Sequence, residues 1–287
     1  MKKAFLLVAL LVAVSLFLWR PASKYPHEFA ICAMFKNEAP WLKEWIVFHH
    51  DVIGFDHFYL YNNDSTDNYK EVLKPFIDKG VVELIEWSSS DPSHRLGDDI
   101  LWYPYQIGAY NDCLKNRALG KAKWVGIFDI DEFLVPVHGA ASFRSYMRGL
   151  DKRRKGSVKF SWRIFGTSNV WDLGPDELLT EKMIYRAADH HDWHNWFKSM
   201  HRPEAVPHAN IHDTPTLHAG YRKRHAKPEA FRLHHYWART AKFCSEKRTT
   251  TKEDLLAELN QQEDRTMEQY LPTLKKALHK WDACYNE

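Results

Sequence analysis

The stretch Lys-Trp-Val-Gly-Ile-Phe-Asp-Ile-Asp-Glu-Phe-Leu, residues 123–134, contains an apolar run that ends in two aspartates. The apolar part is short and rich in β-branched and aromatic residues, which is typical of a buried β-strand. Residues two apart on a strand face the same side, so we expect Asp129 and Asp131 to direct their carboxylates at one point. Open α/β sheets bind ligands at this carboxyl end of their strands. Glu132 falls on the opposite face, where we expect it to support the pair.

Two carboxylates this close together repel each other unless a cation or a proton lies between them. Manganese and magnesium ions suit carboxylate oxygens and keep substrate phosphate oxygens among their ligands. We therefore interpret Asp129 and Asp131 as ligands of Mn²⁺ or Mg²⁺. The alternative is a strand that runs into an acidic, solvated turn, and the rest of the chain must decide between the two.

The chain before this stretch alternates strands and helices. We predict strands at 29–35, 57–61 and 81–87, separated by helices that begin near Pro40 and span 72–77. Because the connections are short, we expect a parallel sheet that winds right-handedly. This is an α/β fold with a mostly parallel central sheet and flanking helices.

Polar residues follow the first two predicted strands, at Asn37 and Glu38 and again at Asn62 and Asp67. They should meet the aspartate pair at one rim of the sheet, which is where such sheets bind nucleotides. A helix predicted over 105–119 should turn polar side chains toward the same pocket, namely those of Gln106, Tyr110, Asn111 and Asp112. The chain has no Gly-x-Gly-x-x-Gly and no Walker loop, so the dinucleotide and P-loop classes lack their signatures.

The second half of the chain offers further candidate site residues. Residues 189–196 combine histidines, aspartates and two tryptophans; we favour a polar loop with tryptophan platforms for a sugar over a metal cluster. Lys198 and Arg202, four apart, are candidates for phosphate contacts, with an exposed basic turn as the alternative. We also predict a strand at 158–165 that leaves the sheet.

Three further expectations concern local structure in this half. Ser142 is predicted to cap a helix that runs to Leu150. Residues 251–278 suggest two amphipathic helices packed on the body. Cys244 and Cys284 are candidates for a disulfide, although spacing alone does not establish pairing.

The composition limits the kinds of partner to expect, and the N-terminal segment predicts where the protein is located. The 287 residues carry a formal net charge of +3 from 40 basic and 37 acidic side chains, which gives no case for a nucleic-acid partner. Residues 1–3 are interpreted as a cytoplasmic tail, 4–20 as one transmembrane helix that serves as a signal anchor, and 21–28 as a short stem. We expect a single-pass type II membrane protein with a luminal domain, for example in the Golgi, and a secreted one if the apolar segment is cleaved.

Several motifs along the chain together resemble glycosyltransferase family 92, a set of GT-A-fold, metal-dependent enzymes. The resemblance covers about residues 29–250, taken as the catalytic domain, with 251–287 as a C-terminal helical segment. The matching pieces, in the order of the family, are Lys36–Trp45, Phe58–Asn68, Ala109–Leu114, Trp124–Pro136, Trp162–Ser168, Lys198–Pro203 and His234–Thr240.

The resemblance implies a GT-A-like fold and the transfer of a hexose from a nucleotide-sugar donor to a glycan acceptor. It favours galactose from UDP-galactose, with Mn²⁺ or Mg²⁺ as cofactor and inversion at the transferred sugar. The sequence leaves two rivals: a nucleotidyl- or phosphotransferase with the same aspartate pair, and a catalytically inactive carbohydrate-binding relative.

Residue roles carried over from the family are expectations in the same sense. Asn37, Glu38, Asn62 and Asp67 would hold the nucleoside, and Asn62 stands where the family motif often has Asp. Asp129 and Asp131 would bind the metal and the diphosphate, and His235 would complete the metal shell, with His212 as second choice. The resemblance also implies that the second half of the chain binds the acceptor, with the strand at 158–165 leading toward it. The general base is sought in this half, where Asp192 and Asp213 are the candidates.

Overall fold

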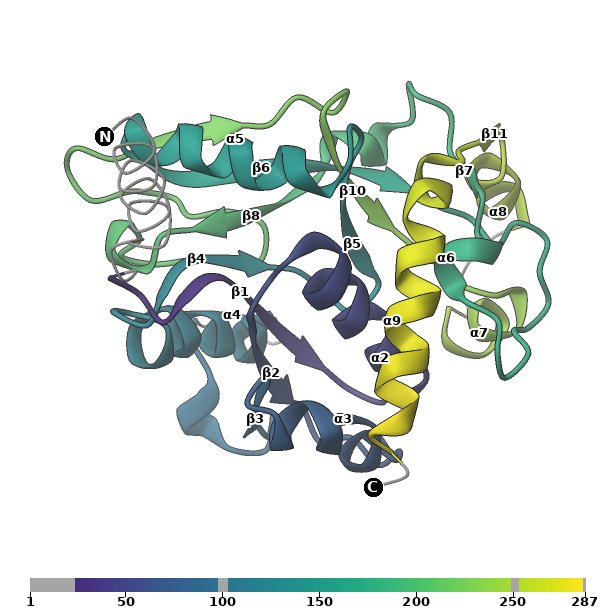
Figure 1. Ribbon diagram of the computed structural model, residues 1–287, viewed down its shortest axis with the longest axis horizontal. Coiled ribbons are helices and arrows are strands. Elements are labelled where there is room, and N and C mark those ends of the chain that lie inside the picture. Colours follow the sequence, from purple (N-terminus) through teal and green to yellow (C-terminus); the bar gives the residue numbers. More distant parts are fainter. Residues whose placement is uncertain (1–23, 98–102, 249–252, 286–287) are drawn as a thin grey trace, which may run out of the picture.

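A computed structural model describes residues 24–97, 103–248 and 253–285 (Figure 1). The predicted cytoplasmic tail and signal anchor lie outside these residues. Within the described ranges, no helix combines the length and the apolar character that crossing a membrane requires.

The centre of the molecule is a mixed nine-stranded sheet with the order β3-β2-β1-β4-β8-β6-β10-β5, and β9 also pairs with β6. A separate two-stranded sheet joins β11 to β7. The strands are β1 (His27–Phe35), β2 (His57–Asn62), β3 (Val82–Glu86), β4 (Ala122–Ile127), β5 (Glu132–Pro136), β6 (Lys155–Ile164), β7 (Tyr185–Arg186), β8 (Phe197–His201), β9 (Arg222–His225), β10 (Phe231–His235) and β11 (Gln262–Glu263).

The two halves of the central sheet are built differently. Strands β3, β2, β1 and β4 are all parallel, as the short βα connections predict. In the other half, β8 runs antiparallel to both β4 and β6, and β5 runs antiparallel to β10. The α/β class is therefore confirmed, whereas the sheet as a whole is mixed. The predicted strand at 158–165 does not leave the sheet, because β6 pairs with β8, β9 and β10 inside it.

Helices cover both faces of the sheet (Figure 1). Residues on β1 alternate between them: Phe29 and Ile31 belong to a core with α2, α3, α5 and α9, while Ala30 and Cys32 belong to a core with α4. The helices are α2 (Ala39–Val47), α3 (Tyr69–Asp78), α4 (Tyr103–Asp112), α5 (Ala140–Lys152), α6 (Leu179–Lys182), α7 (Ala241–Lys247), α8 (Glu253–Leu259) and α9 (Leu271–Ala283). Because both faces are buried, the parallel strands β1, β2 and β4 are largely apolar.

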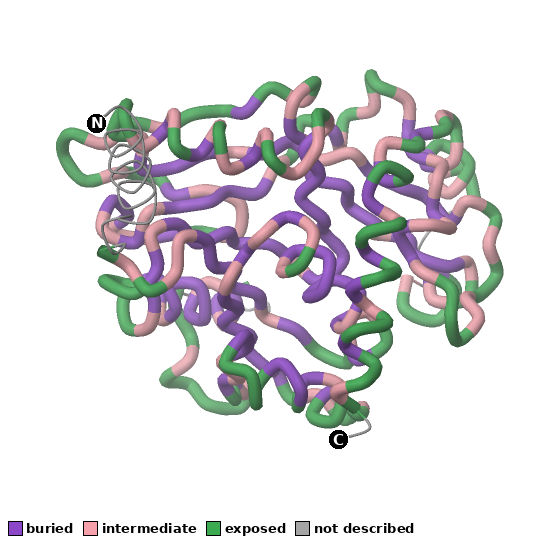
Figure 2. The backbone as a smooth tube through the Cα atoms, viewed as in Figure 1, coloured by how far each residue is buried: buried purple, intermediate pink, exposed green. Residues whose placement is uncertain are grey.

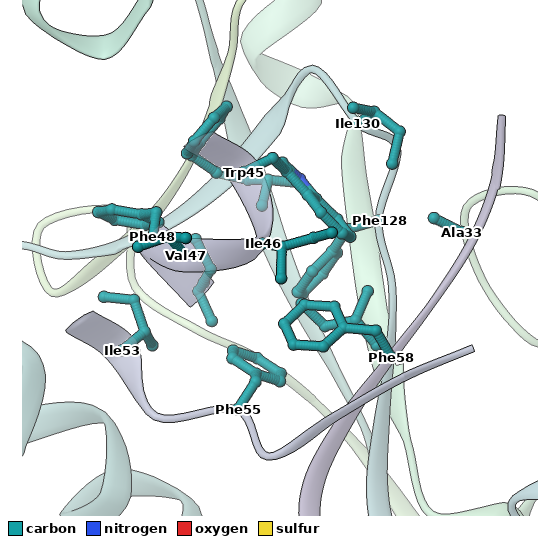
Figure 3. Packing of buried hydrophobic residues seen from close by; sticks show 14 of the residues in the cluster. Ala33, Trp45, Ile46, Val47, Phe48, Ile53, Phe55, Phe58, Phe128 and Ile130 are labelled. Carbon is teal, nitrogen blue, oxygen red and sulfur yellow. The ribbon is translucent and has the colours of Figure 1, made fainter. Parts of the chain in front are cut away.

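The larger core fills the space between α2 and the sheet. Figure 3 shows side chains of α2, among them Trp45 and Ile46, in one cluster with Phe58 of β2 and Phe128, which follows β4. Trp45 also donates its indole N–H to the carbonyl oxygen of Glu132 over 2.8 Å, which ties α2 to the strand that follows the aspartate pair. Figure 2 shows that burial concentrates on the central strands, with exposed segments at the loops and the outer helix faces.

Three local predictions meet the structure with different outcomes. Ser142 lies inside α5 and donates to the carbonyl of Gly139, so it does not cap the helix. Helices α8 and α9 form in the C-terminal segment, and Trp281 of α9 packs 4.2 Å from the ring of Phe76 on α3. No disulfide joins Cys244 to Cys284 within the described residues; Cys244 is buried in α7, and Cys284 follows α9.

Candidate active site

The carboxyl ends of β1, β2 and β4 open onto one cavity of about 450 Å³. This volume lies within the range of pockets that bind small molecules. Both aspartates of the Asp129–Asp131 stretch line it, together with three cationic residues, Lys36, Arg239 and Arg248. The remaining lining residues are Met34, Phe35, Glu38, Asn63, Ser89, Gln106 and Ile130.

The aspartates lie in a turn rather than on a strand. Strand β4 ends at Ile127 and β5 begins at Glu132, and the N–H of Glu132 donates to the carbonyl of Asp129 over 3.0 Å. Strand alternation therefore does not direct the two carboxylates, which is a correction to the sequence interpretation. The turn nevertheless places both at the cavity, each with its own set of partners.

Asp129 is held by three donors. Its carboxylate accepts from the ammonium of Lys198 at 2.8 Å, from the hydroxyl of Tyr110 at 3.0 Å and from the amide of Gln106 at 3.2 Å. Its side chain is about one third exposed, whereas that of Lys198 is fully buried. This arrangement fixes the orientation of the carboxylate and leaves part of it facing the cavity.

Glu132 contacts both Asp129 and Lys198. Its carboxylate accepts from the N–H of Asp129 at 2.9 Å and lies 4.0 Å from the ammonium of Lys198. Burial raises the pKa of Glu132 well above its usual range, against the attraction of Lys198. Burial alone would lower the pKa of Lys198, but Asp129 and Glu132 more than compensate and raise it. Asp129, at 2.8 Å, is therefore the nearest counter-charge of Lys198, and Glu132 lies further away at 4.0 Å.

Asp131 has a different environment on the other side of the turn. Its carboxylate lies 3.5 Å from Nε2 of His235 and 3.6 Å from the guanidinium of Arg239. Burial opposes the charge of Asp131, yet His235, Arg239 and Arg248 outweigh burial and hold its pKa well below the usual range. Asp131 is therefore an anion in a buried position, which is the state that a cation requires of a ligand.

Arg239 is a buried cation with unused hydrogen-bonding capacity. Its guanidinium lies between the rings of Trp41 and Phe243, at 5.2 and 4.4 Å, and pairs with Glu38 at 2.7 Å. Two of its nitrogens, Nε and one Nη, are buried without a hydrogen-bond partner. Burial raises the pKa of Glu38 to about 7, although Arg239 acts in the opposite direction. A buried guanidinium with free N–H groups at a cavity wall is suited to an anionic ligand.

The residues around Asp131 fit a divalent ion in one specific way. Two ligands bound to one ion at right angles lie roughly 3 Å apart, and the 3.5 Å between Asp131 and His235 is close to that separation. The second ring nitrogen of His235 is buried and unpartnered. In the parts of the chain that the structure describes, no three His, Cys, Asp or Glu side chains are grouped to hold a metal. The set fits an ion with few protein ligands, whose shell phosphate oxygens and water complete.

A model of glycosyltransferase family 92 matches residues 25–277. The chain belongs to this family. A family 92 protein of Oryza sativa subsp. japonica is 28% identical over 189 residues, which are 66% of this chain and 28% of that protein. A family 92 protein of Ricinus communis is 27% identical over 222 residues, or 73% of this chain and 35% of the relative.

A galactan beta-1,4-galactosyltransferase of Arabidopsis thaliana is 31% identical over 143 residues, which are 49% of this chain and 26% of that enzyme. The chain thus spans about a third or less of the length of these relatives. Among solved structures, S. aureus TarS 1–349 has a TM-score of 0.42 at 10% identity over 72% of this chain and 60% of that one. The mannosyltransferase PcManGT from Pyrobaculum calidifontis has a TM-score of 0.41 at 13% identity, over 96% of this chain and 82% of that one. At these TM-scores neither likeness carries a conclusion.

In this family 92 chain, the residues predicted to hold the nucleoside mostly organise the rim. Asn37 accepts from the N–H of Thr66 at 2.7 Å, and Asp67 accepts from the N–H of Ala39 at the start of α2 at 2.9 Å. Asn62 is buried. It donates to Glu86 at 2.6 Å and to Tyr69 at 2.9 Å, and it accepts from Ser65 at 3.0 Å. Of the predicted group, Glu38 lines the cavity.

The structure does not bring Asp192 and Asp213, the candidates for the general base, or Arg202, a candidate for phosphate contacts, to this cavity. Asp192 is exposed in a separate hollow beside α8. Asp213 pairs with Lys159 at 2.8 Å and with Lys223 at 2.9 Å, which lowers its pKa despite its partial burial. Arg202 pairs with Asp151 and Glu204, and its guanidinium lies 5.3 Å from the ring of Trp124, at the start of β4. Arg202 is therefore at the opposite end of β4 from Asp129.

Sequence reasoning found part of this site and missed part. Gln106 and Tyr110 reach Asp129 as the α4 pattern predicted. Asn111 instead holds the backbone of Ala209, and Asp112 pairs with Tyr61 and Arg117. The cavity cations Lys36, Arg239 and Arg248 were not assigned to it. Lys36 and Arg239 carried a signal, because each lies in a stretch that resembles the family, whereas Arg248 lies in none.

Proposed function

We propose that this family 92 chain is a GT-A-like glycosyltransferase that moves a hexose from a UDP-sugar to a glycan, with Mn²⁺ or Mg²⁺ as cofactor. The observation that carries the proposal is one cavity of about 450 Å³ where an anionic Asp131, a fixed Asp129 and three cationic residues meet. A nucleoside diphosphate has the matching chemistry, because its phosphates need cations and its metal needs carboxylates. Galactose is the proposed sugar, since a relative is named as a galactan beta-1,4-galactosyltransferase.

Each residue has a defined task in this proposal. Asp131 and His235 hold the metal ion, which when bound would stabilise the negative charge of the departing diphosphate. Lys198, Tyr110 and Gln106 hold Asp129 in one orientation toward the same ligands. The unpartnered N–H groups of Arg239 donate to phosphate oxygens and add positive charge where the leaving group develops its own.

Nucleotide binding is the direct test. Isothermal titration calorimetry of the protein with UDP-galactose is done once in Mn²⁺ and once in EDTA. The affinity for UDP-galactose should be at least about tenfold weaker in EDTA. GDP-mannose serves as the control for the base and the sugar. Absence of UDP-sugar binding in the presence of Mn²⁺ would falsify the proposal, and equal binding in EDTA would remove the metal from it.

The location is a separate proposal. We propose that residues 4–20 act as a signal anchor and place the catalytic domain in the lumen of the secretory pathway, with the Golgi as the expected compartment. Protease protection of microsomes that carry a C-terminally tagged chain tests this orientation. Digestion of the tag without detergent would show that the domain faces the cytosol, which contradicts the proposed orientation. Release of the tagged domain by carbonate washing would indicate that the apolar segment is cleaved.

A further inference from the structure

A cluster of aromatic rings leads from the surface to the candidate metal ligand His235. Trp196 is 51% exposed, and its ring lies 5.0 Å from that of His212. The ring of His212 lies 5.5 Å from that of Trp162, which in turn lies 4.4 Å from that of His235. We call the first three rings, those of Trp196, His212 and Trp162, the aromatic platform.

The backbone fixes this platform against the donor site. The N–H of Trp162 donates to the carbonyl of Trp196 over 2.9 Å, which joins the two tryptophans across β6 and β8. Two residues after Trp196, Lys198 contacts the carboxylate of Asp129. Strand β10, which carries His235, pairs with β6 on its other side (Figure 1). Trp162 therefore lies on β6, between the strands that carry Lys198 and His235, and Trp196 directly precedes β8. His212 lies in the loop after β8 and is tied to that strand through the carbonyl of Phe197.

The chemistry of the platform is that of a sugar-binding surface. Flat aromatic faces pack against the C–H face of a pyranose, and nearby polar groups bind its hydroxyls. Beneath the platform, the indole N–H of Trp162 and Nδ1 of His235 are buried and have no hydrogen-bond partner. Nδ1 of His212 donates to the carbonyl of Phe197 over 3.0 Å, which leaves Nε2 of that ring as an acceptor. Burial lowers the pKa of His212 to about 4, so this ring is neutral near pH 7.

We propose that the aromatic platform binds the terminal hexose of the acceptor glycan, with the ring of Trp196 under the sugar. The inference rests on the proposed function and adds the surface that places the acceptor beside the donor site. An acceptor is favoured over the donor sugar because Trp196 opens to solvent, whereas the lining of the donor cavity includes none of the three platform rings. A glycan chain that extends into solvent fits an exposed platform.

The test compares Trp196→Ala with Trp171→Ala in steady-state kinetics of the full chain. Trp171 is a matched control because it is 66% exposed and lines a different hollow. The probes are UDP-galactose and a soluble β-1,4-linked galacto-oligosaccharide, with UDP release as the signal. We expect Trp196→Ala to raise the KM for the oligosaccharide by about tenfold, as the loss of one stacked face implies. The KM for UDP-galactose should not change, Trp196→Phe should recover part of the loss, and Trp171→Ala should match the wild type.

Each other outcome has a defined meaning. A rise in the KM for UDP-galactose alone would assign the platform to the donor sugar and overturn the proposal. An equal effect of Trp171→Ala, or UDP release that the oligosaccharide does not accelerate in the wild type, would also overturn it. These results differ from failure of the proposed function, in which the wild type does not bind UDP-galactose at all. Because Trp196 is half exposed, thermal unfolding of Trp196→Ala should match the wild type and exclude misfolding as the cause.

Discussion

The two sides of the aspartate turn satisfy their charges in opposite ways. Asp129 already has three donors, including the buried ammonium of Lys198. Asp131 has no contact shorter than the 3.5 Å to His235 among the ion pairs of the described residues. A carboxylate that the protein has already neutralised is fixed in place, whereas one that is anionic and loosely paired retains the capacity to bind a cation. From this difference we propose that Asp129 is held mainly for its orientation and that Asp131 is the metal ligand.

The largest expected effect comes from the loosely paired side. Asp131→Asn removes the anion but keeps the shape, so glycosyl transfer should fall by at least about 10²–10³-fold while the fold persists. Measured turnover with UDP-galactose and Mn²⁺, together with circular dichroism, checks both parts. Turnover close to that of the wild type would mean that Asp131 is not the metal ligand and that the proposed difference in role from Asp129 is wrong.

The tightly paired side should respond in stability. Lys198→Met leaves Asp129 without its counter-charge. Breaking a fully buried pair costs about 3–5 kcal/mol of unfolding free energy, and because Asp129 is about one third exposed we expect a loss near the lower end of that range. Urea denaturation measures this loss. The matched control is Lys74→Met, because Lys74 pairs with Asp78 on an exposed face and should cost less than about 1 kcal/mol. Equal costs for the two lysines would mean that Lys198 does not balance a buried charge.

Glu38 offers a pH test of the same rim. Its pKa is raised to about 7 by burial, against the attraction of Arg239, so the folded protein holds this proton more tightly than the unfolded chain, in which it titrates near 4.5. The resulting stabilisation is present below about pH 4.5 and is lost as the pH rises through about 7, by at most about 3 kcal/mol.

Glu38→Gln stays neutral and should remove this pH dependence. Urea denaturation in EDTA at pH 5 and pH 8 compares the variant with the wild type, and the exposed Glu71→Gln serves as control. The wild type should lose more stability than Glu38→Gln between the two pH values. Parallel losses in both proteins would show that Glu38 is ionised throughout.

The smallest effect is expected outside the cavity. Asp192 is exposed beside α8 and has no place at the donor site, so Asp192→Ala should change neither turnover nor its pH profile by more than about twofold. A loss of turnover of 100-fold or more would restore Asp192 as a catalytic base and would require the loop at 189–196 to move to the cavity.

The sequence by itself determined the α/β class, the parallel half of the sheet and the importance of the Asp129–Asp131 stretch. These follow from local information, because buried parallel strands are apolar throughout and polar residues gather at their carboxyl ends. Sequence reasoning also found Gln106 and Tyr110, since helical spacing puts them four residues apart on one face.

Only the tertiary structure decided which charges meet. Lys198 and Arg239 lie 69 and 108 residues after the aspartates they approach, and no local pattern connects residues so far apart. The same holds for the mixed half of the sheet, where β8 inserts between β4 and β6. That insertion carries Lys198 to Asp129 and Trp196 to Trp162, and it leaves Asp192, Asp213 and Arg202 elsewhere. Pairing between distant strands depends on the packing of the whole core, whereas the tendency of a segment to form a buried strand depends on its own residues.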